Sequence, residues 1–105
     1  MESKRKVLEG LVVRLKNTSR DVFEEFAPVF GYTLDVLELS DAKFARIFGV
    51  SRPTVTRWRN GVTAPHRRMR DTVLTFLETL ALVETLALLK DKALTDETLL
   101  TLRND

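Results

Sequence analysis

The apolar residues recur every three or four positions along most of the chain, which is the spacing of one face of an α-helix. This spacing predicts a helix over roughly residues 4–16, helical structure within 22–37, two short helices between 41 and 60, and a long helix from about 66 to 89. A last short helix is predicted to start at Thr95-Asp96-Glu97. The sequence has no alternating pattern long enough for a strand, so the predicted fold class is all-α.

Two helix-disfavouring residues, Pro28 and Gly31, interrupt the apolar stretch from residue 22 to 37. Proline lacks a backbone N–H and crowds the preceding turn of a helix. The stretch is therefore either one kinked helix or a short helix followed by another that starts near Pro28.

The two short segments between residues 41 and 60 have the punctuation of a helix-turn-helix. Ser40 can cap the first, which ends at Gly49, where a tight turn favours positive φ. After a three-residue turn, Ser51 can cap the second segment, with Pro53 in its first turn and Gly61 at its end. In this motif the second helix can enter the DNA major groove.

Helical spacing separates an inner and an outer side of the second segment. Val55 and Trp58, three residues apart, are predicted to face inward, and Ala45 to face them from the first segment. The spacing of Trp58 favours the core over base stacking. The outward positions left for a partner are Arg52, Thr54, Thr56, Arg57 and Arg59.

The run from Leu39 to Gly61, followed by Ala64-Pro65, resembles the phage-repressor or Cro-like (XRE-type) helix-turn-helix family. The resemblance covers 27 of the 105 residues and includes the family's framework at Ala45, Gly49, Val55 and Trp58. It implies a domain that binds DNA through the second helix of the motif. One position departs from the pattern: Asp41 stands where the family often has a glutamine that bonds a phosphate and braces the recognition helix, and a phosphate would repel a carboxylate.

The charge of the chain is concentrated on the motif. The overall net charge is +2, but residues 41–70 carry +7, whereas residues 1–40 carry −1 and residues 71–105 carry −4. A basic patch of this kind favours a polyanionic partner. Its members are Lys43, Arg46, Arg52, Arg57, Arg59, Arg67, Arg68 and Arg70.

Each candidate contact has a structural alternative. Arg57 is the foremost candidate for a base, because its fork can grip guanine O6 and N7, and Arg52 could reach a base or a phosphate. Thr54 and Thr56 could contact phosphate, base or a thymine methyl, and Arg59 is an outward arginine with no acidic residue nearby in sequence. Three polar residues could have either a structural role, as a cap or a solvated group, or a role as a phosphate ligand: Lys43, Ser51 and Asn60.

Three arginines open the long helix, at Arg67, Arg68 and Arg70. The positive end of the helix dipole disfavours cations there, so a clamp on the DNA backbone is the better explanation. Further along, 12 of the 17 residues from Val73 to Leu89 are apolar, more than one buried stripe needs. The second apolar face would contact a second copy in a homodimer, or else helices 4–16 and 95–103 of the same chain.

Composition bounds the remaining possibilities. The chain has no cysteine and a single histidine, His66, so it lacks the residues for a thiol nucleophile or a histidine metal site, and no cofactor or enzyme activity is expected. Glu78 and Glu84 interrupt the most apolar stretch, which argues against a membrane span. No signal segment opens the chain, so a cytoplasmic location is expected.

These observations predict one helical domain over residues 1–105. Residues 20–65 would form the DNA-binding core, and 66–105 a long helix plus a short terminal helix for dimerisation. The expected function is a sequence-specific regulator, most simply a repressor, that binds an inverted repeat in double-stranded DNA as a homodimer. The alternative is an antitoxin-type protein that binds a partner protein through its C-terminal helices and controls its own promoter; a module that binds only proteins would not need +7 on the motif.

Overall fold

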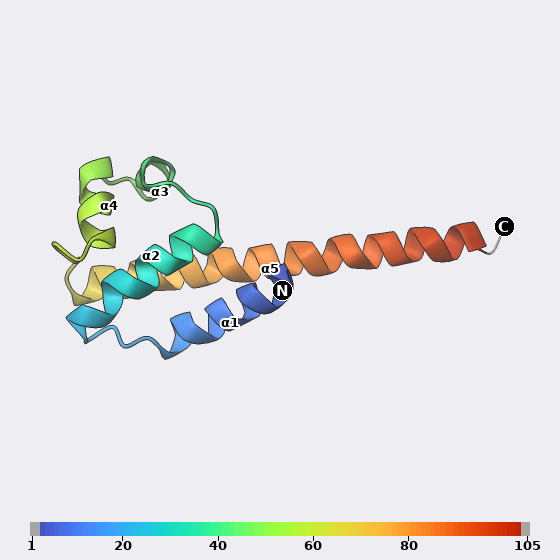
Figure 1. Ribbon diagram of the computed structural model, residues 1–105, viewed down its shortest axis with the longest axis horizontal. Coiled ribbons are helices and arrows are strands. Elements are labelled where there is room, and N and C mark those ends of the chain that lie inside the picture. The colour runs from blue at the N-terminus through green and yellow to red at the C-terminus, as the bar shows by residue number, and fades with distance from the viewer. Residues whose placement is uncertain (1–2, 104–105) are drawn as a thin grey trace.

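Helix α5 packs mainly against α1, and α2 lies between this pair and the two short helices α3 and α4 (Figure 1). The computed structural model describes residues 3–103, with side chains as far as Lys90. In chain order the helical segments are α1 (Lys4–Asn17), the 3-10 turn η1 (Phe23–Glu25), α2 (Phe26–Val36), α3 (Asp41–Phe48), α4 (Arg52–Arg59) and α5 (Arg67–Arg103). The all-α prediction is confirmed: the described residues are helical or connecting segments, with no strand among them.

Helices α1 and α5 run antiparallel. Lys16 near the end of α1 pairs with Glu78 at 3.9 Å, and Arg20 just after it pairs with Asp71 at 3.3 Å, closer to the start of α5. Residues 3–6, at the other end of α1, lie beside Leu88 and Leu89. One side of α5 is therefore covered within the same chain, by the buried leucines of α1.

An aromatic cluster joins α2 to the helix-turn-helix. Phe30 is fully buried and stacks on Phe26 with ring centroids 5.1 Å apart. It also meets the edges of Phe44 from α3 at 5.3 Å and Trp58 from α4 at 5.9 Å. Offset and edge-to-face pairs at these distances add to the stabilisation from burial alone. Trp58 is thus a core residue, as its spacing predicts, and α4 is held by its inner side.

Pro28, which interrupts the apolar stretch from residue 22 to 37, falls at the beginning of a helix. The chain makes the short turn η1 and then α2, which starts at Phe26 and places Pro28 in its first turn. A missing N–H is tolerated there, because the first backbone donors of a helix have no partner within it. Of the two alternatives, the short segment followed by a second helix is therefore the correct one.

The predicted end of the long helix near Leu89 and the separate terminal helix are wrong. Helix α5 continues from Arg67 to Arg103 without a break. The residues between Lys90 and Thr95 include no glycine or proline, so nothing stops the helix before the start signal at Thr95. Residues 95–103 extend α5 and do not form a separate helix that folds back over it. The Cα radius of gyration, 16.9 Å, accordingly exceeds the about 13 Å of a compact domain of this size.

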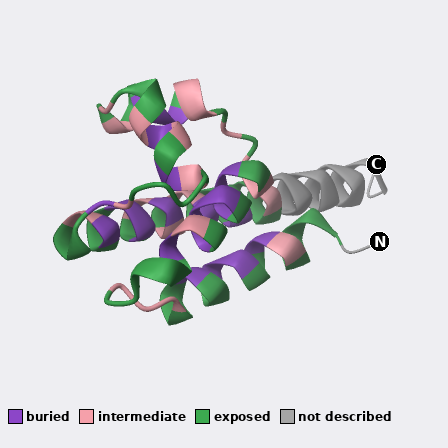
Figure 2. Ribbon diagram, turned by 60° about the vertical axis from the view of Figure 1, so that its left-hand side comes forward, coloured by how far each residue is buried: buried purple, intermediate pink, exposed green. Residues whose placement is uncertain are grey.

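Along its described side chains, α5 has a buried inner side and an exposed outer side (Figure 2). Val73, Leu74 and Leu77 are fully buried against α1 and α2, whereas four large apolar residues further along are exposed: Leu82, Val83, Leu86 and Leu89. By length and composition alone, the segment Arg67–Lys90 would be able to cross a membrane, contrary to what its two glutamates suggest. A mostly buried core helix would meet the same criterion, and 28% of this window is buried inside the protein.

Candidate nucleic-acid interface

Local bonds hold α3 and α4 in the helix-turn-helix arrangement that the sequence predicts. The hydroxyl of Ser40 accepts from the Lys43 N–H at 3.0 Å, and that of Ser51 accepts from the Thr54 N–H at 3.2 Å, so both serines are N-caps. Gly49 adopts φ 82°, and its N–H donates to Ala45 O at 2.9 Å. A side chain at this φ would be strained, so glycine is the fitting residue.

Burial fixes which side of α4 is inside. Val55 and Trp58 are buried in the aromatic core, and Ala45 is buried opposite them, as predicted. Helices α3 and α4 lie together on one side of α5, with α1 on the other (Figure 1). The side of α4 that points away from the core carries Arg52, Pro53, Thr54, Thr56 and Arg57, and is called here the open face of α4.

Arg59 does not belong to this face, and the prediction that it is an outward arginine without acidic neighbours is wrong. Its Nε donates to Asp41 Oδ1 at 2.8 Å, and its Nη1 donates to Asp35 Oδ1 at 2.9 Å and to Gly31 O at 3.4 Å. Only 25% of the Arg59 side chain and 19% of the Asp41 side chain are exposed. Arg59 therefore ties α4 to α2 and α3, and a duplex would meet the other arginines of α4 first.

Thr56 is also engaged inside the protein. Its hydroxyl donates to Asp41 Oδ2 at 2.9 Å, so both carboxylate oxygens of Asp41 accept bonds from α4. The Thr56 hydroxyl proton is therefore not free to donate to a phosphate, whereas the predicted contact of Thr56 with a thymine methyl stays a prediction. Asp41 stands where the resemblance would place a phosphate-binding glutamine, and here it braces α4 from α3.

The contacts of Asp41 with Arg59 and Thr56 are called here the brace, and the charges in it stabilise one another. Burial acts to raise the pKa of Asp41, but the hydrogen bonds from Arg59 and Thr56 and the charges of Arg59 and Arg52 outweigh it, so the pKa lies below its usual value. Burial acts to lower the pKa of Arg59, and the bonds to Asp41 and Asp35 outweigh it, so that pKa is raised. Both groups are therefore charged at neutral pH.

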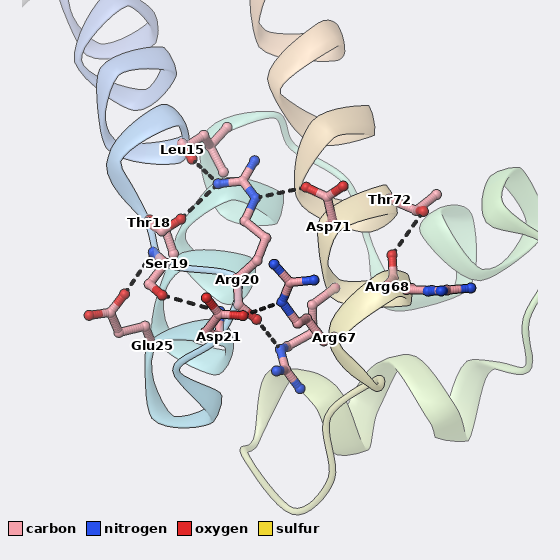
Figure 3. A network of polar contacts seen from close by, with 11 residues as sticks. Leu15, Thr18, Ser19, Arg20, Asp21, Glu25, Arg67, Arg68, Asp71 and Thr72 are labelled. Carbon is pink, nitrogen blue, oxygen red and sulfur yellow. Dashed lines mark hydrogen bonds and ion pairs between the residues drawn. The ribbon is translucent and has the colours of Figure 1, made fainter.

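The three arginines at the start of α5 have different surroundings (Figure 3). Arg70 is buried and donates to Arg20 O at 2.9 Å and to Pro65 O at 2.8 Å, so its predicted place in a backbone clamp is wrong. Arg67 is exposed and pairs with the exposed Asp21. The side chain of Arg68 points away from the Arg20–Asp21–Asp71 cluster and is exposed, which suits a phosphate contact.

Two further predicted contacts are exposed, and one unforeseen residue joins them. Lys43 on α3 and Asn60, which ends α4, are both open to solvent. Sequence reasoning treated Pro53 only as a helix-starting residue. The structure places it with Arg52, Thr56 and Arg57 around a shallow depression on the open face of α4. Its position two residues after the capping Ser51 was the available signal.

The chain matches no protein-family model, no curated protein and no solved structure. Within the part of the chain that the structure describes, no group of three or more histidine, aspartate or glutamate side chains is placed to hold a metal ion. The function is therefore inferred from the geometry and charge of the chain's own residues.

A double-mutant cycle measures the brace. We expect Arg59→Ala to lower the free energy of unfolding by about 1–3 kcal/mol, because it leaves the half-buried Asp41 carboxylate without its charged partner. Asp41→Ala in the Arg59→Ala background should cost far less than in the wild type, since the interaction is already gone. Urea denaturation provides the measurement, and Arg46→Ala at an exposed position of α3, expected within about 0.5 kcal/mol of wild type, is the control. Strict additivity of the two single substitutions would contradict the brace.

The lowered pKa of Asp41 also predicts a pH dependence. A carboxyl group whose pKa is lower in the folded state stabilises the fold fully above its unfolded pKa, and this contribution is lost as the pH falls through the folded value. Wild-type stability should therefore fall below about pH 4, and the loss should be smaller for Asp41→Asn. Thermal denaturation from pH 2 to 7 measures both proteins, and parallel curves for the two would contradict the assignment.

Proposed function

We propose that this protein is a sequence-specific regulator that binds double-stranded DNA by inserting α4 into the major groove. The observation that carries the proposal is that α4 is anchored both along its inner side and at its end. Val55 and Trp58 fix its inner side in the core, Arg59 fixes its end to Asp41, and its open face presents Arg52 and Arg57 to solvent. A firmly held helix with exposed arginines on its outer side suits the reading of base edges.

The contacts divide into positioning and reading groups. Lys43 on α3 and Arg68 on α5 flank α4 in the chain and are exposed cations suited to phosphates. Arg57, whose Nη2 lies 3.4 Å from the Thr54 hydroxyl, and Arg52 at the start of α4 are the base-reading candidates. The bond to Asp41 removes Arg59 from the predicted DNA contacts, so the proposed interface rests on fewer side chains than the sequence predicts.

The outer side of α5 supports assembly into a homodimer. Leu82, Leu86 and Leu89 follow one another at intervals of four and three residues, which puts them on one stripe, and 64% of Leu86 is exposed. Two copies of such a stripe can bury each other, and two half-sites on DNA match the two-fold symmetry of a dimer. Binding as a dimer to an inverted repeat within a promoter would repress transcription by occupying the site.

The same stripe favours one alternative. An antitoxin-type protein would place a partner protein on α5, whose region from residue 71 to 105 carries a net charge of −4. A basic partner would then share this helix, while α4 controlled the promoter. Co-purification of the chain with a basic protein at fixed stoichiometry would support this second function.

Selection of bound sequences from a random DNA pool tests the main proposal. An enriched inverted repeat bound at physiological salt is the expected result, and no binding to duplex DNA even in dilute buffer would refute it.

On the selected site, Arg57→Ala should weaken binding by about 1–3 kcal/mol and relax the preference at one base pair. Arg68→Ala should weaken binding to all sequences alike and reduce the salt slope by about 1. Arg5→Ala on α1 is the control, and equal effects of the first two substitutions would contradict their separate roles.

The dimer has its own test. Leu86→Glu places a charge on the exposed stripe and should shift the protein from dimer to monomer in analytical ultracentrifugation, because an unpaired charge is costly in an apolar contact. Helix content should remain that of the wild type, since Leu86 is exposed in the protomer. Thr72→Glu, at an exposed position nearer the start of α5, is the matched control and should leave the mass unchanged. A monomeric wild-type chain at high concentration would contradict the dimer.

A further inference from the structure

The depression on the open face of α4 has an unexpected character. Two of its four lining residues, Arg52 and Arg57, are arginines, yet the surface that lines it is mostly apolar. The remaining members are Pro53 and Thr56. The two arginines therefore line a carbon-rich notch, which is a different environment from a plain cationic surface.

The brace explains why the notch is apolar. The hydroxyl of Thr56 donates to Asp41 Oδ2 at 2.9 Å, and the same carboxylate is held by Arg59 at 2.8 Å. Because the hydroxyl is directed to Asp41, the γ-methyl group is what Thr56 has left to offer to the notch. Pro53 adds a rigid ring without a backbone N–H, so neither residue brings a free hydrogen-bond donor.

We infer that this notch is a subsite for the 5-methyl group of a pyrimidine base. The inference rests on the proposed function, since it requires α4 to lie in the major groove. A methyl group is the apolar feature that a base pair displays in that groove, on thymine or on 5-methylcytosine. Pro53 and Thr56 suit such a group because they bring no free hydrogen-bond donor, and Arg52 and Arg57, which line the same notch, suit guanines next to it.

The notch gives a methylated pyrimidine an advantage over its unmethylated counterpart. An unmethylated base would leave the carbon surface uncovered, and because the Thr56 proton is committed to Asp41, Thr56 would donate no hydrogen bond to that base. Burial of one methyl group is worth about 0.8 kcal/mol, which corresponds to about a four-fold difference in affinity. Methyl removal at this one position should therefore be felt, whereas thymines elsewhere in the site should tolerate it.

The experiment uses the full-length chain and its selected duplex. Each thymine of a half-site is replaced in turn by deoxyuridine, which deletes only the methyl group, and binding is measured at constant salt. We expect about a four-fold loss at one thymine next to a guanine and little change at the others. At the sensitive position, a 5-methylcytosine–guanine pair should bind more tightly than a cytosine–guanine pair. Tightest binding to the thymine duplex identifies thymine as the natural source of the methyl group, and tightest binding to the 5-methylcytosine duplex identifies methylated DNA.

Two substitutions of Thr56 separate its methyl group from its hydroxyl. Thr56→Ser keeps the bond to Asp41 and removes the methyl, so the thymine-to-uracil ratio should fall from about four to about one. Thr56→Val keeps a methyl in place and removes the hydroxyl, so the ratio should persist even if overall affinity falls. An unchanged ratio in Thr56→Ser, or a selected site indifferent to every methyl deletion, would overturn the subsite alone. Absence of DNA binding by the wild type would overturn the proposed function and the subsite together.

Discussion

An eight-residue helix is too short to persist by itself in water, so the position of α4 depends wholly on what holds its inner side. Val55 and Trp58 bury that side among the aromatic rings of α2 and α3, and Arg59 adds a charged bond to Asp41 at its end. The open face can be rich in arginine because the opposite side supplies the stabilisation. Without this anchoring the cations would belong to a flexible segment with no defined geometry toward a groove.

Asp41 connects packing to chemistry. As the first residue of α3 it sits at the positive end of the helix dipole, a favourable place for a carboxylate. Its two oxygens take one bond each from Thr56 and Arg59, which ties the two helices of the motif together. The same bonds decide what α4 can present to a partner, because they withdraw one guanidinium and one hydroxyl from the surface. A single acidic residue thus shapes the site although it would itself be repelled by DNA.

Local rules made much of this structure predictable. Spacing and capping residues place α1, α3 and α4, identify the left-handed turn at Gly49 and assign Trp58 to the core, since each depends on residues close in sequence. The partners of Arg59 were not predictable in this way. Periodicity tells which side of a helix a residue occupies, but it does not tell that α2 and α3 place carboxylates opposite that side. Ile47 is a second case: it fits the apolar period of α3 and is nevertheless exposed. The end of α5 was predicted wrongly because the start signal at Thr95-Asp96-Glu97 begins a new helix only if the preceding helix has already ended, and α5 has not.

The uninterrupted course of α5 has a consequence for anything attached to its far end. At 1.5 Å per residue, the 37 residues from Arg67 to Arg103 make a rod about 55 Å long. The rod begins a few residues after α4 and leads away from it (Figure 1). A partner bound to α5 beyond the globular part would consequently be held at a fixed distance and in a fixed direction from the helix-turn-helix. Because the distance is fixed, binding at the helix-turn-helix would restrict where a partner on the far part of α5 can lie. A substitution that allowed α5 to bend would relax this restriction.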